Sequence, residues 1–325
     1  MRDIKILWLC ALCGVLFAGA FSAQADVSRK HKSSSQSWGA YESTSADYYQ
    51  ADRSAEESTT QWTRGLMKTM SGGKPIQSVS ITRLDKELVW QLDPKKKTYT
   101  EMTFAEFRDM LKQGQEEMTE GEEGADTVQV PEDQYDWTVE AKSDPSPKTI
   151  NGWTCRNMRA VATGVNRAET QDTVWIMMDA WNSMDVPGGD EIAAFSMAYL
   201  KALGLDETAL TPGLTSAAML YQKQFSALAQ EMKKAPGEPV TSTIEIKRRQ
   251  LVGPSIGKAV GEAAKEEIMG KLPFGKKKEK KPEEPRWEHK VKFSVTTELT
   301  EASVGPVDAA KFEVPAGYEL KRERK

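Results

Sequence analysis

The chain has 325 residues, of which 39% are hydrophobic and 28% are charged, and its formal net charge is −4. This length allows one large domain or two smaller ones, and this composition supplies enough apolar side chains for a folded core. The mild negative charge excludes the strongly basic surface that nucleic acid binding requires, so we expect no nucleic acid partner.

The first 25 residues have the features of a secretory signal peptide. Arg2 and Lys5 give a basic start, residues 6–21 form an apolar run, and an Ala-Gln-Ala cleavage site occupies 23–25. The apolar run is short for a membrane span, and retention as an N-terminal anchor is the alternative. We therefore predict a cleaved signal peptide at 1–25 and a secreted, periplasmic protein.

The segment after the signal peptide is polar. Residues 26–57 are rich in Ser, Ala, Asp and Glu and poor in aliphatic side chains. Such a composition cannot bury enough apolar surface to fold, so we predict a largely disordered segment there. Residues 59–70 fit either a helix or a strand, because Trp62, Leu66 and Met70 have helical spacing while the threonines favour a strand.

A meander of three antiparallel strands is predicted over residues 79–102. Its second turn contains Asp93 and Pro94, and proline fixes the φ angle that the second position of a type I turn needs. The lysines at 95–97 are expected to be solvated, and contact with an anionic surface is the alternative. The sequence TFAE at 103–106 is a capping box, which predicts the start of a helix.

Strands and helices alternate over the rest of the chain. Period-2 alternation or continuous apolar runs predict the strands, and apolar spacings of three and four predict the helices. The predicted strands are 135–142, 153–163, 172–181, 240–252 and 287–299, and the predicted helices are 190–203, 214–232 and 256–272.

The order of these elements predicts an α+β fold. Because neighbouring strands are joined by short turns, we expect a curved, mostly antiparallel sheet with helices on one face. We assign residues 58–325 to one domain, with a helical insertion at 204–285 and a charged loop at 275–285.

Four segments resemble a family of bacterial secreted proteins that carry a domain of unknown function. They are ITRLDKELVWQLDPKKKTYTEMTFAE at 81–106, GWTC at 152–155, residues 175–195 with the helix entry VPGGDE, and VPAGY at 314–318. That family is similar in layout to the LolA/LolB-like proteins, the periplasmic carriers and receptors of outer-membrane lipoproteins. The resemblance implies an incomplete β-barrel whose helices cover the concave face and enclose a cavity for acyl chains.

A cluster of methionine and aromatic side chains in the middle of the chain is the main candidate for a ligand site. Methionine packs adaptably, which suits a cavity for flexible acyl chains and equally suits an ordinary core. By apolar character and placement, the candidate lining residues are Trp90, Tyr99, Trp175, Met177, Tyr221 and Phe225. We predict a non-enzymatic protein that binds a lipid or a lipoprotein acyl chain; the alternative is an envelope interaction protein without a ligand.

A serine hydrolase is the third hypothesis. GPSIG at 253–257 matches the motif G-x-S-x-G between a strand and a helix, with Ser255 as nucleophile and His289 as base. Such a nucleophile sits on a parallel sheet, whereas the sheet predicted here is antiparallel. We therefore predict that the protein is not an enzyme.

No cofactor or metal is expected. With two histidines and one cysteine after the signal peptide, Cys155, neither a zinc set of N and S ligands nor an internal disulfide can be assembled. A basic cluster with Lys276, Lys277 and Lys278 follows the apolar stripe of the third predicted helix, as in segments that dock to an anionic membrane or an envelope partner. A solvated linker is the alternative.

Overall fold

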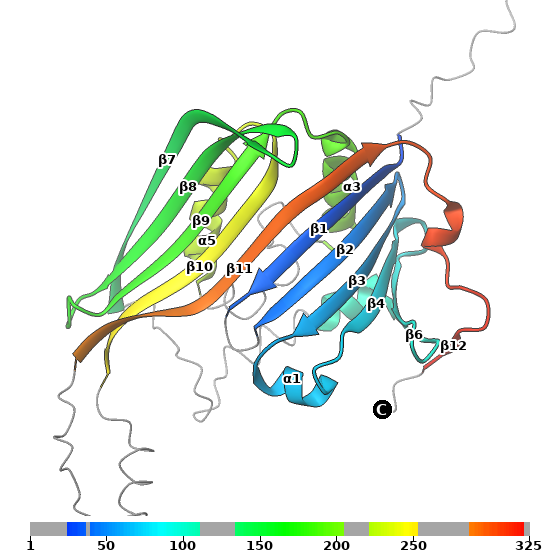
Figure 1. The fold of residues 1–325 in the computed structure, drawn as a ribbon, viewed down its shortest axis with the longest axis horizontal. Helices are drawn as coiled ribbons and strands as arrows, with labels where there is room; N and C mark the ends of the chain where they lie inside the picture. The colour runs from blue at the N-terminus through cyan, green and yellow to red at the C-terminus, as the bar shows by residue number, and fades with distance from the viewer. Residues whose placement is uncertain (1–24, 37–39, 111–133, 205–220, 253–285, 322–325) are drawn as a thin grey trace, which may run out of the picture.

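The structure is a computed structural model that describes residues 25–36, 40–110, 134–204, 221–252 and 286–321 (Figure 1). These residues form one 12-stranded sheet in the order β12-β6-β5-β4-β3-β2-β1-β11-β10-β9-β8-β7. The sheet is not closed, because β12 and β7 are its two edges. Every neighbouring pair is antiparallel except β12 with β6.

The strands are β1 (Val27–Ser35), β2 (Tyr41–Gln50), β3 (Arg53–Trp62), β4 (Ile76–Arg83), β5 (Leu88–Asp93), β6 (Thr98–Thr103), β7 (Tyr135–Ile150), β8 (Trp153–Asn166), β9 (Thr173–Ser183), β10 (Glu238–Val252), β11 (Arg286–Val304) and β12 (Glu319–Leu320).

Most of the described residues in 26–36 and 40–57 form strands, so the prediction of a largely disordered N-terminal segment is wrong. It contains β1, β2 and the first half of β3, and β1 pairs with β2 on one side and with β11 on the other. The polar composition suggested disorder because these strands contain few aliphatic side chains. They are held instead by main-chain hydrogen bonds to a neighbouring strand on each side.

The predicted strands of the meander and of the second half of the chain are confirmed. β4, β5 and β6 form the meander, with the short helix η1 (Leu84–Lys86) in its first turn. In the second turn the Lys96 N–H donates to Asp93 Oδ1 at 3.0 Å, and Lys97 has a φ of 52°. The ambiguous residues 59–70 contain both elements, because β3 ends at Trp62 and helix α1 (Gly65–Ser71) follows.

The predicted helices are confirmed where the structure describes them. In the capping box, Thr103 Oγ1 accepts the Glu106 N–H at 3.2 Å and Glu106 Oε2 accepts the Thr103 N–H at 2.8 Å. Residues 104–110 are helical. α3 (Gly189–Ala202) and α5 (Gln222–Met232) correspond to the predicted helices at 190–203 and 214–232. Outside the described residues lie the predicted helix at 256–272, the charged loop at 275–285, the first turns of the helix at 214–232 and residues 1–24 of the signal peptide.

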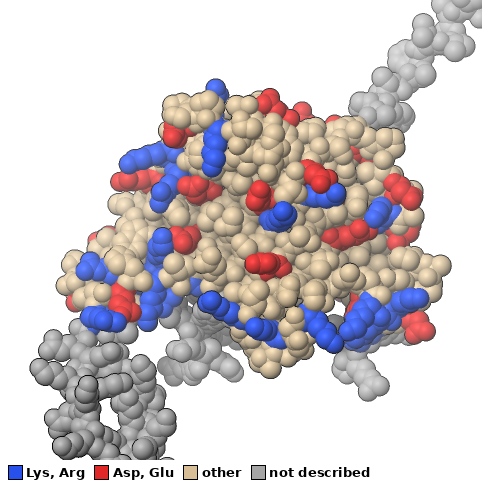
Figure 2. Space-filling view, viewed as in Figure 1, with Lys and Arg blue, Asp and Glu red and all other residues tan. Residues whose placement is uncertain are grey.

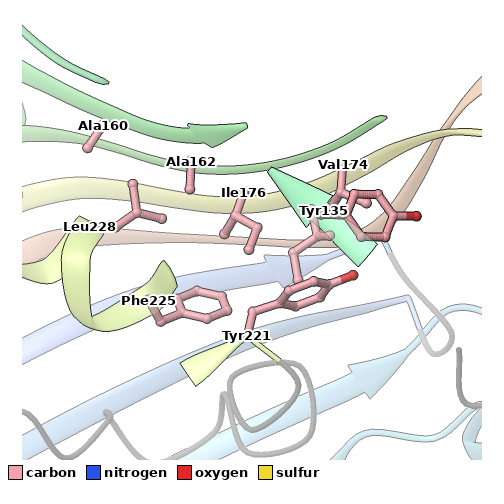
Figure 3. Close-up of a cluster of buried hydrophobic side chains, with 9 residues drawn as sticks. Tyr135, Ala160, Ala162, Val174, Ile176, Tyr221, Phe225 and Leu228 are labelled. Atoms are coloured by element: carbon pink, nitrogen blue, oxygen red, sulfur yellow. The ribbon is translucent and has the colours of Figure 1, made fainter. Parts of the chain in front are cut away.

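Helices α3 and α5 lie on the same side of the sheet, which we call the helix face (Figure 1). Phe225 and Leu228 of α5 are fully buried in a cluster that includes Ile176 of β9 (Figure 3). In α3, the Phe195 ring lies 5.6 Å from the Tyr49 ring of β2 in an edge-to-face contact. The apolar sides of both helices are therefore buried against strands that are far apart in the sheet.

The opposite side, the outer face, is covered at one end by residues 305–318, which include η3 (Ala309–Phe312). Phe312 is fully buried with Ala55 of β3 and Ile81 of β4. Arg83 donates to the main-chain oxygen of Phe312 at 3.3 Å and pairs with Asp85 and Glu313.

Acidic and basic side chains are intermixed over most of the outer face, which Figure 2 shows. One apolar cluster of this face lies beneath residues 305–318, where β3, β4 and β5 meet. The largest cluster of β7 to β10 lies on the helix face instead, and a smaller one joins the β7–β8 turn to β10 and β11.

Replacing Phe312 by alanine tests the packing of residues 305–318. We expect Phe312→Ala to lower the free energy of unfolding by about 3–5 kcal/mol, because a fully buried aromatic side chain is lost and a cavity remains. The matched control is Leu66→Ala, since Leu66 is 74% exposed and its truncation should change stability by no more than about 0.5 kcal/mol. Urea unfolding measures both, and equal losses in the two variants would contradict this packing.

Candidate ligand-binding face

The structure does not bring the six predicted cavity residues together. Tyr221 and Phe225 lie side by side on the helix face (Figure 3). Trp90 and Tyr99 belong to the cluster beneath residues 305–318, where Trp90 Nε1 donates to Glu101 Oε2 at 2.8 Å. The remaining pair, Trp175 and Met177, comes from β9 and lies on the side of the sheet opposite Tyr221 and Phe225.

Trp175 and Met177 alternate along β9 with Ile176, which packs against α5. Because successive strand residues point to opposite faces, Trp175 and Met177 lie on the outer face. The Trp175 ring stacks on His289 of β11 with a centroid distance of 5.3 Å. His289 is exposed there, and Ser255, its partner in the hydrolase hypothesis, lies outside the described residues.

A continuous apolar row crosses the middle of the helix face. Its members are successive cross-strand partners from β8 to β3, and all but Ser35 are apolar or aromatic: Ala160, Met178, Ile244, Val295, Ser35, Tyr41 and Trp62. The Tyr41 and Trp62 rings meet edge to face at 5.3 Å. Met178, Ile244 and Val295 are only half-buried. Apolar surface therefore extends from the α5 core across the sheet without full cover.

Two hydroxyl-rich rows lie beside the apolar row, toward α3. The first consists of Ser242, Thr297, Ser33, Ser43 and Thr60, and the second continues from His31 through Ser45, Ser58 and Ser78. Neighbouring hydroxyls bond to each other across the strands: Ser43 Oγ lies 2.9 Å from Thr60 Oγ1, and Ser58 Oγ lies 2.8 Å from Ser78 Oγ. Along β1, β2 and β3, the helix face thus changes from the apolar row to the first hydroxyl-rich row over two residues.

A charged cluster follows the hydroxyl rows. Arg29 of β1 forms an ion pair with Glu238 at 3.1 Å, and its Cα partner in β2 is Asp47. His31 Nε2 lies 3.1 Å from Asp47 Oδ2. Among the described residues, Arg29 Nε, His31 Nδ1 and Asp47 Oδ1 are buried and have no hydrogen-bond partner. Buried polar atoms are nearly always paired, so these three unpaired atoms are exceptions to the usual pattern of folded proteins.

Two side chains beside this cluster, Tyr49 and Glu56, have raised pKa values. Burial raises the pKa of Tyr49 well above its usual range, and the negative charge of Asp47 adds to the rise. The pKa of Glu56, the Cα partner of Asp47 in β3, is also raised. The larger cause is loss of solvent around the Glu56 carboxyl group beside the neighbouring strands, although the side chain remains exposed. The smaller cause is repulsion by the negative charge of Asp47.

Sequence reasoning missed this cluster because it lies in the segment that was predicted to be disordered. In the structure, Val27 and Arg29 of β1 are buried and Lys30 and Lys32 are exposed. The sequence VSRKHKSSS at 27–35 shows no alternation of apolar and polar residues, so hydrophobic periodicity gave no signal of this strand.

In the described part of the chain, no group of three His, Cys, Asp or Glu side chains is arranged to hold a metal ion. Cys155 is buried, and burial raises the pKa of its thiol. The basic residues Lys276, Lys277 and Lys278 lie outside the described residues, so their docking role stays a prediction.

A scan against models of known protein families finds no match, and a search of curated proteins finds no significant relative. The resemblance to the secreted family and to the LolA/LolB-like proteins therefore rests on the four sequence segments alone.

None of the helices in the described ranges is long and apolar enough to cross a membrane.

Alkaline titration tests the burial of the tyrosines on the helix face. Burial raises the pKa of Tyr221 to about 12, partly opposed by Arg248, whereas an unfolded tyrosine ionises near pH 10. The folded state then holds a proton that the unfolded state has lost. Stability should fall as the pH rises from about 10 and level off above about 12.

Tyr221→Phe removes this contribution, so the urea midpoint of the variant should decline less steeply than that of the parent over the same pH range. Circular dichroism in urea at a series of pH values measures both slopes. Parallel slopes would show that Tyr221 ionises equally easily in the folded and unfolded chains.

Proposed function

We propose that the protein is a periplasmic, non-enzymatic carrier that binds one lipid or similar amphiphile on the helix face of a LolA-like incomplete barrel. The observation that carries the proposal is the half-buried apolar row from Met178 to Trp62, which lies directly beside hydroxyl-rich rows. An acyl chain covers the apolar row and gains the free energy of apolar burial. The polar end of the ligand then meets hydroxyl and charged groups rather than hydrocarbon.

Helix α5 supports this role through its contacts. Phe225 and Leu228 are fully buried and fix α5 over β8 and β9, while Ile244 and Val295 further along the same row are half-buried. A bound chain extends the apolar contact of α5 toward the centre of the sheet. Movement of the helices away from the sheet exposes this contact and releases the ligand.

Native mass spectrometry of the secreted chain, followed by organic extraction, tests the proposal directly. A stoichiometric adduct of lipid mass supports it and identifies the ligand class. A chain that stays unliganded after incubation with a total lipid extract contradicts it, and favours the alternative of an envelope interaction protein.

The position of the acyl chain can be tested with two adjacent residues of β10. Ile244 lies in the apolar row, whereas Thr243 lies on the outer face, where its hydroxyl is 3.0 Å from Thr296 Oγ1. We expect Ile244→Lys to weaken binding of fluorescently labelled palmitate about tenfold or more, corresponding to about 1.4 kcal/mol. The charge would otherwise be buried against the acyl chain.

Thr243→Lys is the matched control, because the same charge enters the same strand on the opposite face. It should leave palmitate affinity unchanged. Circular dichroism establishes that both variants are folded, and equal affinity of the two variants would place any acyl chain elsewhere.

A further inference from the structure

A groove of about 340 Å³ lies on the outer face, between the β7–β8 turn and strands β1, β2 and β11. This volume is at the lower end of the range found for small-molecule sites. The groove is on the side of the sheet opposite the helix face, so a ligand can occupy it whether or not the helix face binds a lipid.

The floor of the groove consists of two cross-strand rows. In one, Ser28 Oγ lies 2.8 Å from Ser303 Oγ, and in the other the Lys30 ammonium lies 2.7 Å from Glu301. On β2 these rows continue into Tyr48 and Ala46. The small side chains of Ser28, Ser303 and Ala46 lie among larger ones, and this difference in size creates the hollow.

The wall of the groove is the β7–β8 turn, which hydrogen bonds hold in place. Asn151 has a φ of 50° and Gly152 a φ of 90°, which form the tight turn. Asn151 Nδ2 donates to Glu298 Oε1 and to the main-chain oxygen of Leu299, both at 2.8 Å. These bonds anchor the turn to β11 and bring Trp153 to the groove.

A bulge completes the shape. The β1–β11 register shifts between Lys30 and His31, which leaves Thr300 without a partner in the ladder. Thr300 Oγ1 donates to the main-chain oxygen of Lys30 at 3.1 Å and lines the groove. Because side-chain hydrogen bonds of Asn151 and Thr300 hold the turn and the bulge in place, the groove is formed before any ligand arrives, which lowers the entropic cost of binding.

We propose that this groove binds a sugar, one or two rings of a neutral carbohydrate. Tyr48 and Trp153 both line the groove, but the Lys311 ammonium lies over the Tyr48 ring at 4.7 Å. Trp153 is therefore the aromatic ring that we assign to the apolar C–H face of a sugar ring. Hydroxyls of Ser28, Thr300 and Ser303 line the same space as donors and acceptors.

The charges in the groove favour a neutral ligand. Lys30 and Glu301 cancel each other, so neither an anion nor a cation is attracted. Their side chains are 58% and 65% exposed, so the pair itself adds little stability, and sugar hydroxyls can bond to both charged groups at small cost.

The test uses the full chain with four probes: glucose, N-acetylglucosamine and the β-1,4-linked dimer of each. Saturation-transfer NMR should show transfer from the protein to the ring protons of at least one probe. Quenching of tryptophan fluorescence, in which Trp153 participates, then gives the Kd. The absence of transfer to all four probes would overturn the proposal.

Two variants on β2 locate the site. Ala46→Leu fills the floor of the groove and should raise the Kd about tenfold or more. Thr44→Leu introduces the same side chain two residues earlier on β2, on the same face but outside the groove. It should leave the Kd unchanged. Equal affinity of the two variants would place the sugar elsewhere and overturn the assignment.

Glu301→Ala serves as a second variant in case Ala46→Leu disturbs folding. Glu301 is largely exposed, so its truncation should preserve the fold while removing an acceptor for sugar hydroxyls. A higher Kd with an unchanged melting temperature supports the groove as the site, and an unchanged Kd counts against it.

Discussion

The pairing of β1 with β11 is the constraint on which the rest of this fold depends. It is the ladder that joins the first series of strands, β2 to β6, to the second series, β7 to β11. Its register runs from Val27 opposite Val304 to Ser35 opposite Val295. A slip of one residue would turn every β1 side chain to the other face. Arg29 would then leave the charged cluster, and Lys30 would leave the outer groove.

The strands on the two sides of this pairing carry their largest apolar clusters on opposite faces. The later strands receive α5 on the helix face, through Phe225 and Leu228. The earlier strands are covered on the outer face by residues 305–318, which follow directly after β11. On the helix face of β2 and β3, polar side chains lie between Tyr49, which contacts α3, and the Tyr41–Trp62 pair, and Glu56 is exposed among them. The apolar row and the hydroxyl rows meet where these two burial patterns change over.

Features that depend on adjacent residues could be predicted from the sequence. The pairing of distant strands, and the face of the sheet that each side chain occupies, could not. The Asp93 turn and the Thr103 capping box each depend on a few adjacent residues, and both are present. β1 depends on a partner far along the chain, as the contact between Ser28 and Ser303 shows, and composition carries no information about it. The candidate site was limited in the same way, because aromatic or thioether character at Trp175 and Met177 does not reveal which face they occupy.

The charged cluster beside α3 is more polar than folding alone requires. Arg29 is buried and paired with Glu238, yet its Nε, together with His31 Nδ1 and Asp47 Oδ1, lacks a partner among the described residues. Apolar side chains of similar volume at such positions are often neutral or stabilising, so stability does not explain these residues. On the proposed function, they have a clear use. Under that proposal, the apolar row would supply most of the binding free energy for any acyl chain, whereas the cluster would select the polar group of the amphiphile.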